Sequence, residues 1–435
     1  MKTVIVIGGG AAGMTAAIAA AGAGAAVTLL EKNEKLGKKI YITGKGRCNL
    51  TNACDMQEFT GHVVSNPRFF LSALHGFDNV QTVEWFESLG MPTKTERGAR
   101  VFPVSDKSSD VIRALERECR RTGVSVHLRT EVKGLLTEPV NAAENGSAED
   151  SGKERKKRKP AVTSRVTGVV LSDGTKLSAD SVILATGGLS YPTTGSTGDG
   201  YRMARATGHT VTRLLPSLVS LVSPDTCCAE LAGLSLRNVG VSFRNADGKS
   251  LFEDFGELLF THRGISGPTV LTATAFCADA LVGGTVVLDL KPGLRDDLLD
   301  ARIVRDFEAG HAKAMGNVIG GLVPAALGAE VLRRSGIPAA KKAGEVTKEE
   351  RRRLAETLRH FTIAVSGMGG YNEAVVTKGG VETSEVNPST MESRLTRGLY
   401  FAGELLDLDA TTGGFNLQIA WSTGMLAGRS AAKET

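Results

Sequence analysis

The sequence predicts an α/β fold in which the two ends of the chain build one domain around an inserted β region. Three observations predict it. The chain opens with a short apolar run, a glycine-rich turn and an Ala-rich stretch, which are typical of a strand, a turn and a helix. From about residue 210 the pattern changes to short strand candidates followed by helical segments. After residue 398 it returns to an apolar strand and a long helix of small residues.

Length and composition bound the class of protein. The 435 residues predict two or three domains, and 41% hydrophobic with 23% charged residues is typical of a globular protein. No apolar run is long enough to span a bilayer, and the apolar N-terminus is too short for a signal peptide, so we expect a cytoplasmic protein without a membrane partner. The net charge of +5 permits RNA, although no DNA partner is expected. Six scattered cysteines without a C-x-x-C pair predict neither a disulfide framework nor a metal site.

The opening stretch has the pattern of a dinucleotide cradle. Val4 to Ile7 predicts a buried strand, and Gly8, Gly10 and Gly13 match G-x-G-x-x-G before a helix predicted from Ala11 to Ala23. Gly8 permits the tight turn, Gly10 lets the backbone approach a pyrophosphate, and Gly13 lets the helix pack closely on the strand. The free N–H groups and the dipole at the helix start favour phosphates.

Glu31 closes a second predicted strand, which runs from Ala26 to Leu30. A carboxylate at this spacing accepts the hydroxyls of an unphosphorylated adenosine ribose. The motif leaves open whether the dinucleotide is FAD or NAD. The polar, glycine-rich stretch from Lys32 to Asn52 predicts a loop at the carboxyl edge of the sheet, where ligands lie in open α/β sheets.

Helices and strands alternate in the next region. A strand predicted at 181–185 leads to a glycine-rich turn, Gly195 to Gly200, before a helix for which Thr197 or Asp199 is a candidate N-cap. Residues 138–160, which carry the basic run Lys153 to Lys159, predict a disordered hairpin tip that is either a solvated loop or an RNA contact. The other predicted helices are 66–74, 80–89, 107–122 and 201–207, and the other predicted strands are 124–128, 131–136, 165–171 and 176–177.

An insert follows, and the chain then closes on α/β elements. Short strands at 218–222, 239–244, 257–260 and 285–290 predict a small antiparallel barrel or sandwich. Helices are predicted within 296–334 and 348–359, and returning strands at 361–365 and 374–377. The closing elements are a strand at 399–402, a loop at 407–414 and a helix at 415–432.

Six motifs together resemble one family. They are Gly8-Gly-Gly-Ala-Ala-Gly13, Thr43-Gly-Lys-Gly-Arg-Cys-Asn49, Ala185-Thr-Gly-Gly188 with Thr197-Gly-Asp-Gly-Tyr201, Phe260-Thr-His-Arg-Gly-Ile-Ser-Gly-Pro268, Val376-Thr-Lys-Gly-Gly-Val-Glu382, and Gly403-Glu404 with Gly413-Gly-Phe-Asn-Leu-Gln418. The set is similar to the YhiN/BaiN group of FAD-dependent oxidoreductases, also labelled aminoacetone-oxidase-like, over nearly the whole chain. Many flavoproteins share the first motif, whereas the second, third, fifth and sixth are specific to the group.

The resemblance implies FAD as the cofactor and a particular architecture. We expect a discontinuous Rossmann-like FAD-binding domain of the two-dinucleotide-binding-domain flavoprotein type at 1–195 and 389–435. An antiparallel β-barrel insert would occupy 196–292 and 361–388, and a small helical subdomain 293–360. Members of the group are assigned reductions of activated C=C bonds, in 3-oxo-4,6-diene bile-acid intermediates or in a uridine of large-subunit ribosomal RNA. Both add hydride to a carbon β to a carbonyl, so the expected substrate is a small enone or RNA.

The matched motifs also imply cofactor contacts. Glu31 would hold the adenosine ribose, and Glu404 the ribityl chain or the pyrophosphate side. Backbone N–H groups at the start of the last helix would face the flavin N1–C2=O and stabilise the charge of reduced flavin. Four residues, Arg47, Cys48, Asn49 and Thr51, would border the isoalloxazine ring. The predicted cofactor-binding set is Gly8, Gly10, Ala11, Ala12, Gly13, Glu31, Lys32, Arg47, Cys48, Asn49, Thr51, Val132, Thr186, Gly187, Gly188, Asp199, Gly403, Glu404, Gly414, Asn416, Leu417 and Gln418.

Substrate reduction also needs a proton donor and a group that polarises the carbonyl. His262 and Arg263 are the predicted catalytic pair, with structural roles as the alternative, and Tyr191 and Tyr371 are weaker donor candidates. The spacing of Cys48 is wrong for the redox pair of a flavin disulfide reductase, so a packed thiol is predicted.

The sequence leaves the electron source and two other functions open. Gly367-Met-Gly-Gly-Tyr-Asn372 follows a strand but has Asn at its third motif position and no clear helix after it, so we predict no second dinucleotide cradle. NAD(P)H bound transiently at the flavin face is the expected donor, with an electron-donor protein as the alternative. The other functions are an amine or aminoketone oxidase that uses dioxygen, and a non-catalytic FAD-containing RNA-binding protein. An apolar pocket would favour a steroid substrate, and a basic groove would favour RNA.

Overall fold

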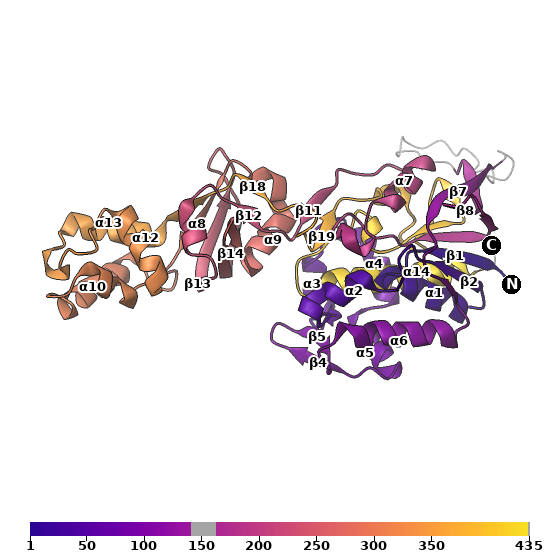
Figure 1. Cartoon of the computed structure of the whole chain (residues 1–435), viewed down its shortest axis with the longest axis horizontal. Helices are drawn as coiled ribbons and strands as arrows, with labels where there is room; N and C mark the ends of the chain where they lie inside the picture. Colours follow the sequence, from indigo (N-terminus) through magenta and orange to yellow (C-terminus); the bar gives the residue numbers. More distant parts are fainter. Residues whose placement is uncertain (141–161, 434–435) are drawn as a thin grey trace, which may run out of the picture. The chain divides into compact units, whose positions relative to one another are not determined.

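The computed structural model describes residues 1–140 and 162–433 and divides into two compact units (Figure 1). Unit 1 holds the chain up to Pro216 and again from Val375 onward, and unit 2 is Ser217–Ala374. The hairpin tip predicted at 138–160 lies outside the described residues beyond Val140. The five-segment domain division stays a prediction.

Unit 1 is built on a five-stranded parallel sheet. Its strand order is β21-β10-β1-β2-β6, so the C-terminal strand lies two places from the N-terminal one. Central strands β1 and β10 are apolar and almost fully buried, as expected for a parallel sheet covered on both faces. The predicted Rossmann-type α/β fold is therefore confirmed. The strands are β1 (Thr3–Ile7), β2 (Ala26–Leu30), β6 (Ser125–His127), β10 (Ser181–Leu184) and β21 (Leu399–Phe401).

Helices from the two ends of the chain pack against each other. Figure 1 shows α1 (Ala11–Gly22, indigo) beside α14 (Phe415–Ala431, yellow). A Cβ on Gly424 would lie 2.5 Å from the Ala12 carbonyl oxygen, and one on Gly428 would lie 2.2 Å from that of Ala16. The small residues of α14 therefore allow the two backbones to approach closely, and this approach fixes the C-terminal helix against the opening motif.

Smaller layers surround this sheet. The stretch from Lys32 to Asn52, predicted as a loop, contains a short helix, because Ile40 is buried in the core and Gly37 takes the positive φ of 68° at the helix start. One sheet has the order β3-β5-β4, another β20-β8-β7 with β9 on β8, and β11 pairs with β19. These elements of unit 1 are α2 (Lys38–Ile42), β3 (Thr51–Asn52), α3 (Met56–Gly61), α4 (Pro67–Gly76), α5 (Asn79–Ser88), β4 (Thr93–Glu96), β5 (Arg100–Pro103), α6 (Ser108–Arg121), β7 (Val132–Pro139), β8 (Ser164–Leu171), β9 (Lys176–Ser178), α7 (Asp199–Ala206), β11 (Leu215–Ser217), β19 (Val376–Lys378) and β20 (Thr396–Arg397).

Unit 2 contains one sheet of seven strands in the order β17-β16-β13-β14-β15-β12-β18. Its edge strands β17 and β18 do not pair with each other, so the described residues form an open sheet where a barrel was predicted. The last two strands at one edge are only two residues long, too short to carry the sheet round to closure. The strands are β12 (Leu221–Val222), β13 (Ser235–Arg244), β14 (Ser250–Thr261), β15 (Gly264–Ser266), β16 (Thr285–Asp289), β17 (Phe361–Ala364) and β18 (Gly367–Met368).

The helices of unit 2 share a hydrophobic core with that sheet. Ile303 and Leu354 from the helices belong to the same buried cluster as Phe243 and Leu288 from the strands. A helical subdomain separate from the sheet is therefore not confirmed. The helices are α8 (Thr226–Glu230), α9 (Pro268–Cys277), α10 (Asp296–Ala309), α11 (Met315–Val318), α12 (Ala325–Ser335) and α13 (Lys348–Arg359).

Among the described residues, no one helix has the length and apolar character needed to cross a membrane. One sharply bent pair, Met315–Gly321 with Ala325–Ser335, meets these criteria by length and composition only.

Candidate functional site

The glycine turn after β1 forms the cradle that the motif predicts. Gly8 takes a φ of 105°, and its N–H donates to the Leu30 carbonyl oxygen at 2.9 Å. A Cβ on Gly13 would lie 1.8 Å from the Gly8 carbonyl oxygen, so only glycine fits where the helix meets the strand. A Cβ on Gly10 would meet no atom within 4 Å, which leaves open space beside the backbone at the start of α1.

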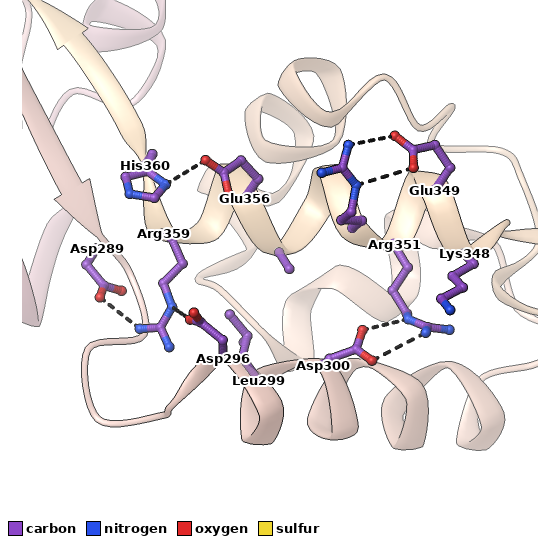
Figure 2. A pocket seen from close by; sticks show the side chains of 12 residues that line it. Asp289, Asp296, Leu299, Asp300, Lys348, Glu349, Arg351, Glu356, Arg359 and His360 are labelled. Atoms are coloured by element: carbon purple, nitrogen blue, oxygen red, sulfur yellow. Dashed lines mark hydrogen bonds and ion pairs between the residues drawn. The ribbon is translucent and has the colours of Figure 1, made fainter.

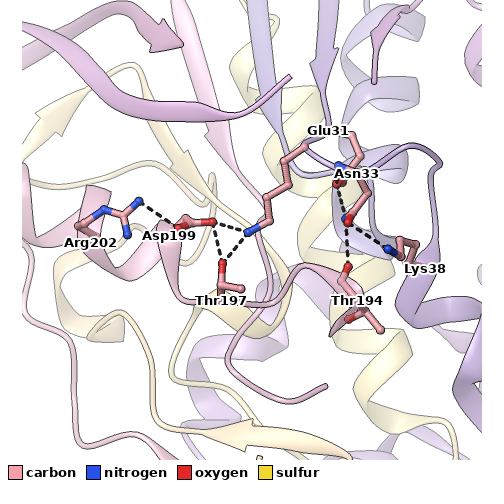
Figure 3. A network of polar contacts seen from close by, with 9 residues as sticks. Glu31, Asn33, Lys38, Thr194, Thr197, Asp199 and Arg202 are labelled. Atoms are coloured by element: carbon pink, nitrogen blue, oxygen red, sulfur yellow. Dashed lines mark hydrogen bonds and ion pairs between the residues drawn. The ribbon is translucent and has the colours of Figure 1, made fainter. Parts of the chain in front are cut away.

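Glu31 lies at the end of β2 with its carboxylate turned back toward the cradle (Figure 3). Its Oε2 accepts the Gly9 N–H at 2.7 Å, and its Oε1 accepts the backbone N–H of Asn33 at 2.8 Å and the Asn33 side-chain amide at 2.6 Å. The side chain is buried, and three donors therefore fix its orientation. This arrangement suits a carboxylate that must present an acceptor to a ribose.

Lys32 and Asp199 form an ion pair that joins two distant segments (Figure 3). Lys32 Nζ lies 2.5 Å from both Asp199 Oδ2 and Thr197 Oγ1, and Arg202 reaches Asp199 Oδ1 at 3.0 Å. Burial alone would raise the pKa of Asp199, but the Lys32 ammonium and the Thr197 hydroxyl outweigh it and hold that pKa below its usual value. Neither predicted N-cap residue caps α7, because the N-cap position is held by Gly198 at a φ of 83°.

The Glu404 carboxylate accepts hydrogen bonds from three separate segments of the chain. Its Oε2 lies 2.6 Å from Lys39 Nζ, and its Oε1 accepts the Ser190 hydroxyl at 3.0 Å and the Thr377 N–H at 2.8 Å. Ser190 and Thr377 are fully buried. A Cβ on Gly188 would lie 2.4 Å from Thr377 Oγ1, which explains the glycine after β10. Glu404 thus braces the carboxyl edge of the sheet.

The loop from Thr43 to Thr51 contains the residues predicted to border the flavin ring, and two of them, Arg47 and Cys48, differ in their surroundings. Arg47 Nη2 lies 2.5 Å from both Glu96 Oε1 and Asp106 Oδ1, and these hydrogen bonds raise the pKa of the guanidinium. Cys48 is buried at a φ of 60°, and burial raises the pKa of its thiol to about 12. The Arg47 side chain is therefore held by Glu96 at the end of β4 and by Asp106, which follows β5.

The start of α14 is tied to the same loop. Asn416 makes its amide contacts with Ala410 and Thr411, within the stretch that precedes the helix. The Thr51 hydroxyl donates to Gln418 Oε1 at 2.7 Å, and Gln418 Nε2 donates to the Phe77 carbonyl oxygen at 3.1 Å. These side chains are used within the protein, so the groups that the helix start offers a ligand are the first-turn backbone N–H groups.

The residues of unit 1 fit FAD on three observations. The space beside Gly10 is open. Among the residues that the structure describes, Asn49 Oδ1 and Thr186 Oγ1 are buried side-chain oxygens without a hydrogen-bond partner, and both belong to predicted cofactor stretches. Unit 1 also brings together 1–51, 186–199 and 403–418, which contain every predicted cofactor residue except Val132. Val132 begins β7 of the same unit and is buried.

The predicted catalytic pair lies in unit 2, in the turn between β14 and β15. His262 and Arg263 are both exposed, and Gly264 closes the turn with its φ of 150°. Arg263 Nη1 lies 3.4 Å from Glu373 Oε1, and Ser220 donates to the other oxygen of Glu373 at 3.2 Å. Burial raises the pKa of Tyr371, the weaker donor candidate two residues before Glu373.

An open pocket of about 860 Å³ lies between α10 and α13 (Figure 2). Most of its charged side chains form ion pairs with one another. Arg351 bonds Asp300 at 2.7 Å, and Arg359 bonds Asp289 at 2.8 Å and Asp296 at 3.1 Å. Most of the charge in this pocket is therefore used in contacts within the protein. In the described part of the chain, no cluster of three or more His, Cys, Asp or Glu side chains is placed to hold a metal ion.

Sequence reasoning missed two residues at the site, Asn33 and Lys39. Asn33 follows Glu31 by two positions, and this spacing alone carries no known signature. Lys39 lies 365 residues before Glu404, so only the folded chain reveals their pairing.

Comparison with known proteins places the chain among flavoprotein relatives. The family model described as "HI0933-like protein Rossmann domain" matches residues 2–430. The chain is 35% identical over 439 residues to the 3-dehydro-bile acid delta(4,6)-reductase of Clostridium scindens, covering 100% of both chains. It is 30% identical over 433 residues to the ribosomal RNA dihydrouridine synthase of Haemophilus influenzae, covering 99% of this chain and 98% of that one. The fold is similar to that of 3-ketosteroid-delta4-(5alpha)-dehydrogenase from Rhodococcus jostii RHA1, with a TM-score of 0.52, 18% identity, and coverage of 99% of this chain and 96% of that one.

Proposed function

The chain belongs to the HI0933-like (YhiN/BaiN) family of FAD-dependent Rossmann proteins, and from this premise we propose that it reduces an activated carbon–carbon double bond. The observation that carries the proposal is the 35% identity, over the full length of both chains, to a bile-acid delta(4,6)-reductase. The proposed substrate is a small enone of the steroid type. FAD, bound and reduced, supplies the hydride for such a reaction.

We assign the binding of FAD to unit 1. Glu31 holds the adenosine ribose, and the open side of the Gly10 turn admits the pyrophosphate. Asn49 and Thr186 supply buried oxygens that lack a partner within the described protein. The backbone N–H groups in the first turn of α14 would face the flavin ring and would stabilise negative charge on it.

Reduction of an enone adds a hydride to the carbon β to the carbonyl and a proton to the α carbon. Negative charge builds on the carbonyl oxygen in between, and a cation or a hydrogen-bond donor stabilises it. We assign these roles to Arg263 as the polarising cation and to His262 as the proton donor, because both are exposed in the β14–β15 turn, within the motif Phe260 to Pro268 that the chain shares with the family it resembles. NAD(P)H is the proposed electron donor, with an electron-donor protein as the alternative.

Reduction of a uridine in ribosomal RNA is the second candidate, and it is supported by the relative named for that activity. The charge distribution bears on it. Residues 153–159 hold six basic residues and one acidic residue, and so account for the whole net charge of +5. On the helices of unit 2, by contrast, arginines such as Arg302, Arg333 and Arg351 are paired with carboxylates. RNA binding would therefore depend on the 153–159 run.

The choice between these functions can be tested by reducing the flavin anaerobically and mixing the protein rapidly with one acceptor at a time. We expect a steroid 4-en-3-one to reoxidise the flavin and to yield the saturated ketone. Uridine-containing ribosomal RNA as the faster acceptor would favour the second candidate, and serine substitution of the basic residues in 153–159 should then abolish the reaction. Reoxidation by dioxygen with peroxide release, and by neither alkene, would favour an amine oxidase. If the bound flavin cannot be reduced, the protein would be a non-catalytic FAD-containing RNA-binding protein.

His262→Ala serves as the matched variant in the same assay. If His262 donates the proton, the variant should retain its FAD but reoxidise with the enone on the order of 100-fold more slowly. Equal loss of FAD and of activity would remove His262 from the reaction.

A further inference from the structure

We propose that Asn33 is the positioning residue for Glu31, and that its side-chain amide sets the orientation in which the carboxylate meets the adenosine ribose. The inference rests on the proposed function, since it needs a dinucleotide bound at the cradle. It adds a residue that the opening motif does not contain.

The contacts of the Asn33 amide support this role. One hydrogen of Nδ2 goes to Glu31 Oε1 at 2.6 Å, and the other goes to the Thr194 carbonyl oxygen at 3.1 Å. Asn33 Oδ1 accepts Lys38 Nζ at 3.2 Å (Figure 3). The amide is therefore held from three sides, and its rotamer is defined by its neighbours.

The carboxylate has little freedom of its own. Its other donors, the backbone N–H groups of Gly9 and Asn33, are fixed by the chain. The Asn33 amide is thus the one side-chain donor among the three, and it decides which lone pairs of Glu31 stay free for a ribose hydroxyl. Because Glu31 is buried, water cannot readily take the place of that donor, and loss of the hydrogen bond would cost free energy.

The segment that follows β10 comes unusually close to the Asn33 side chain, and a glycine makes this close approach possible. A Cβ on Gly195, which has a φ of 102°, would lie 2.5 Å from Asn33 Nδ2. The glycine lets the 194–195 backbone come close enough to accept from the amide. Asn33 therefore couples the Glu31 carboxylate to a segment about 160 residues away in the sequence.

Two substitutions separate hydrogen-bond donation from shape. Asn33→Asp keeps the size of the side chain, but an ionised carboxylate cannot donate and repels Glu31. Asn33→Ser shortens the side chain and leaves the backbone contact with Glu31 in place. Lys38→Met is the control, because it removes the group that touches the far side of the amide, together with an exposed ion pair to Glu34, and leaves the Asn33–Glu31 contact in place.

The test measures the affinity of the apoprotein and of each variant for two ligands, ADP and 2′,3′-dideoxy-ADP, by calorimetry. Comparing the two ligands in each protein shows how much binding depends on the ribose hydroxyls. The wild type should bind ADP on the order of tenfold more tightly than the dideoxy analogue, because Glu31 accepts from the ribose hydroxyls. In Asn33→Asp and Asn33→Ser, we expect ADP binding to weaken roughly tenfold and the preference for ADP over the analogue to fall to about twofold. Lys38→Met should keep the wild-type preference.

A residue that only supports the fold would weaken both ligands equally, so an unchanged preference in both variants would overturn the positioning role. Thermal unfolding of each variant checks that the comparison is made on folded protein, and either variant that folds decides the question. The proposed function fails in a different way: a wild-type protein that binds neither FAD nor ADP would remove the dinucleotide site, and the role of Asn33 with it.

Discussion

Replacement of Gly13 by alanine should destabilise the apoprotein by about 3 kcal/mol, or prevent folding altogether. The new Cβ would lie 1.8 Å from the Gly8 carbonyl oxygen, and that atom belongs to the backbone of the turn and cannot move aside. Strand β1 and helix α1 would have to move apart. This movement would also disturb the packing of α1 against α14. Denaturant unfolding of the FAD-free protein measures the effect.

Gly10→Ala is the matched substitution three residues earlier. Gly10 has a φ of −86° and a ψ of −165°, which alanine adopts without strain, and the new Cβ would meet no protein atom within 4 Å. The apoprotein should therefore stay within about 1 kcal/mol of the wild type. FAD affinity should nevertheless fall on the order of tenfold or more, since the methyl group would occupy the space through which the backbone approaches the pyrophosphate. Unchanged FAD affinity in Gly10→Ala would place the cofactor elsewhere.

Replacement of Glu404 by leucine should have the next largest effect. It would leave the buried Thr377 N–H without its acceptor and the Lys39 ammonium with only the Ser190 hydroxyl oxygen as a partner. We expect a loss of about 2 kcal/mol in the free energy of unfolding, at the lower end for a broken buried pair because both side chains are about one-fifth exposed, 23% for Lys39 and 18% for Glu404. FAD binding should weaken as well, since the variant loosens the edge of the sheet.

Glu404→Gln and Lys39→Met separate the two roles of this carboxylate. The glutamine keeps an oxygen for Thr377 and Ser190 but loses the charge, and the methionine removes the cation alone. If bracing dominates, Glu404→Gln should recover most of the stability that Glu404→Leu loses. Equal stability of Glu404→Leu and the wild type would show that the cluster does not brace the sheet.

Local motifs made the cradle predictable. The strand, glycine turn, helix and acid between Val4 and Glu31 follow from spacing, because each position has a steric or electrostatic requirement that few residues meet. The structure puts Glu31 against Gly9 through a hydrogen bond of 2.7 Å, the placement that such spacing implies.

Pairings between distant segments were not predictable in this way. Lys32 and Asp199 were both candidate cofactor residues, but nothing in the sequence indicates that they bond each other. Arg47 was predicted to border the flavin ring, which stays a prediction, and nothing in the sequence indicates that its side chain bonds Glu96 and Asp106. Contacts of this kind depend on how the layers stack, which periodicity does not encode.

In the insert, too, the sequence predicted local elements better than their assembly. Short strand-like segments in the sequence predicted most of its strands, including β13 and β16. Closure into a barrel depends on strand number, tilt and register, and among the described residues the sheet ends in the two-residue strands β12 and β18 without closing. Strand existence is a local property, whereas closure is a global one.

We propose that both ends of the sequence build one FAD site in unit 1. The most direct measurement is the flavin content of the purified protein, obtained by releasing the chromophore with denaturant, identifying it by mass and counting it per chain. We expect FAD at about one molecule per chain, or stoichiometric uptake of FAD by protein isolated without it. Protein that is colourless and takes up no FAD on titration would show that unit 1 does not hold this cofactor.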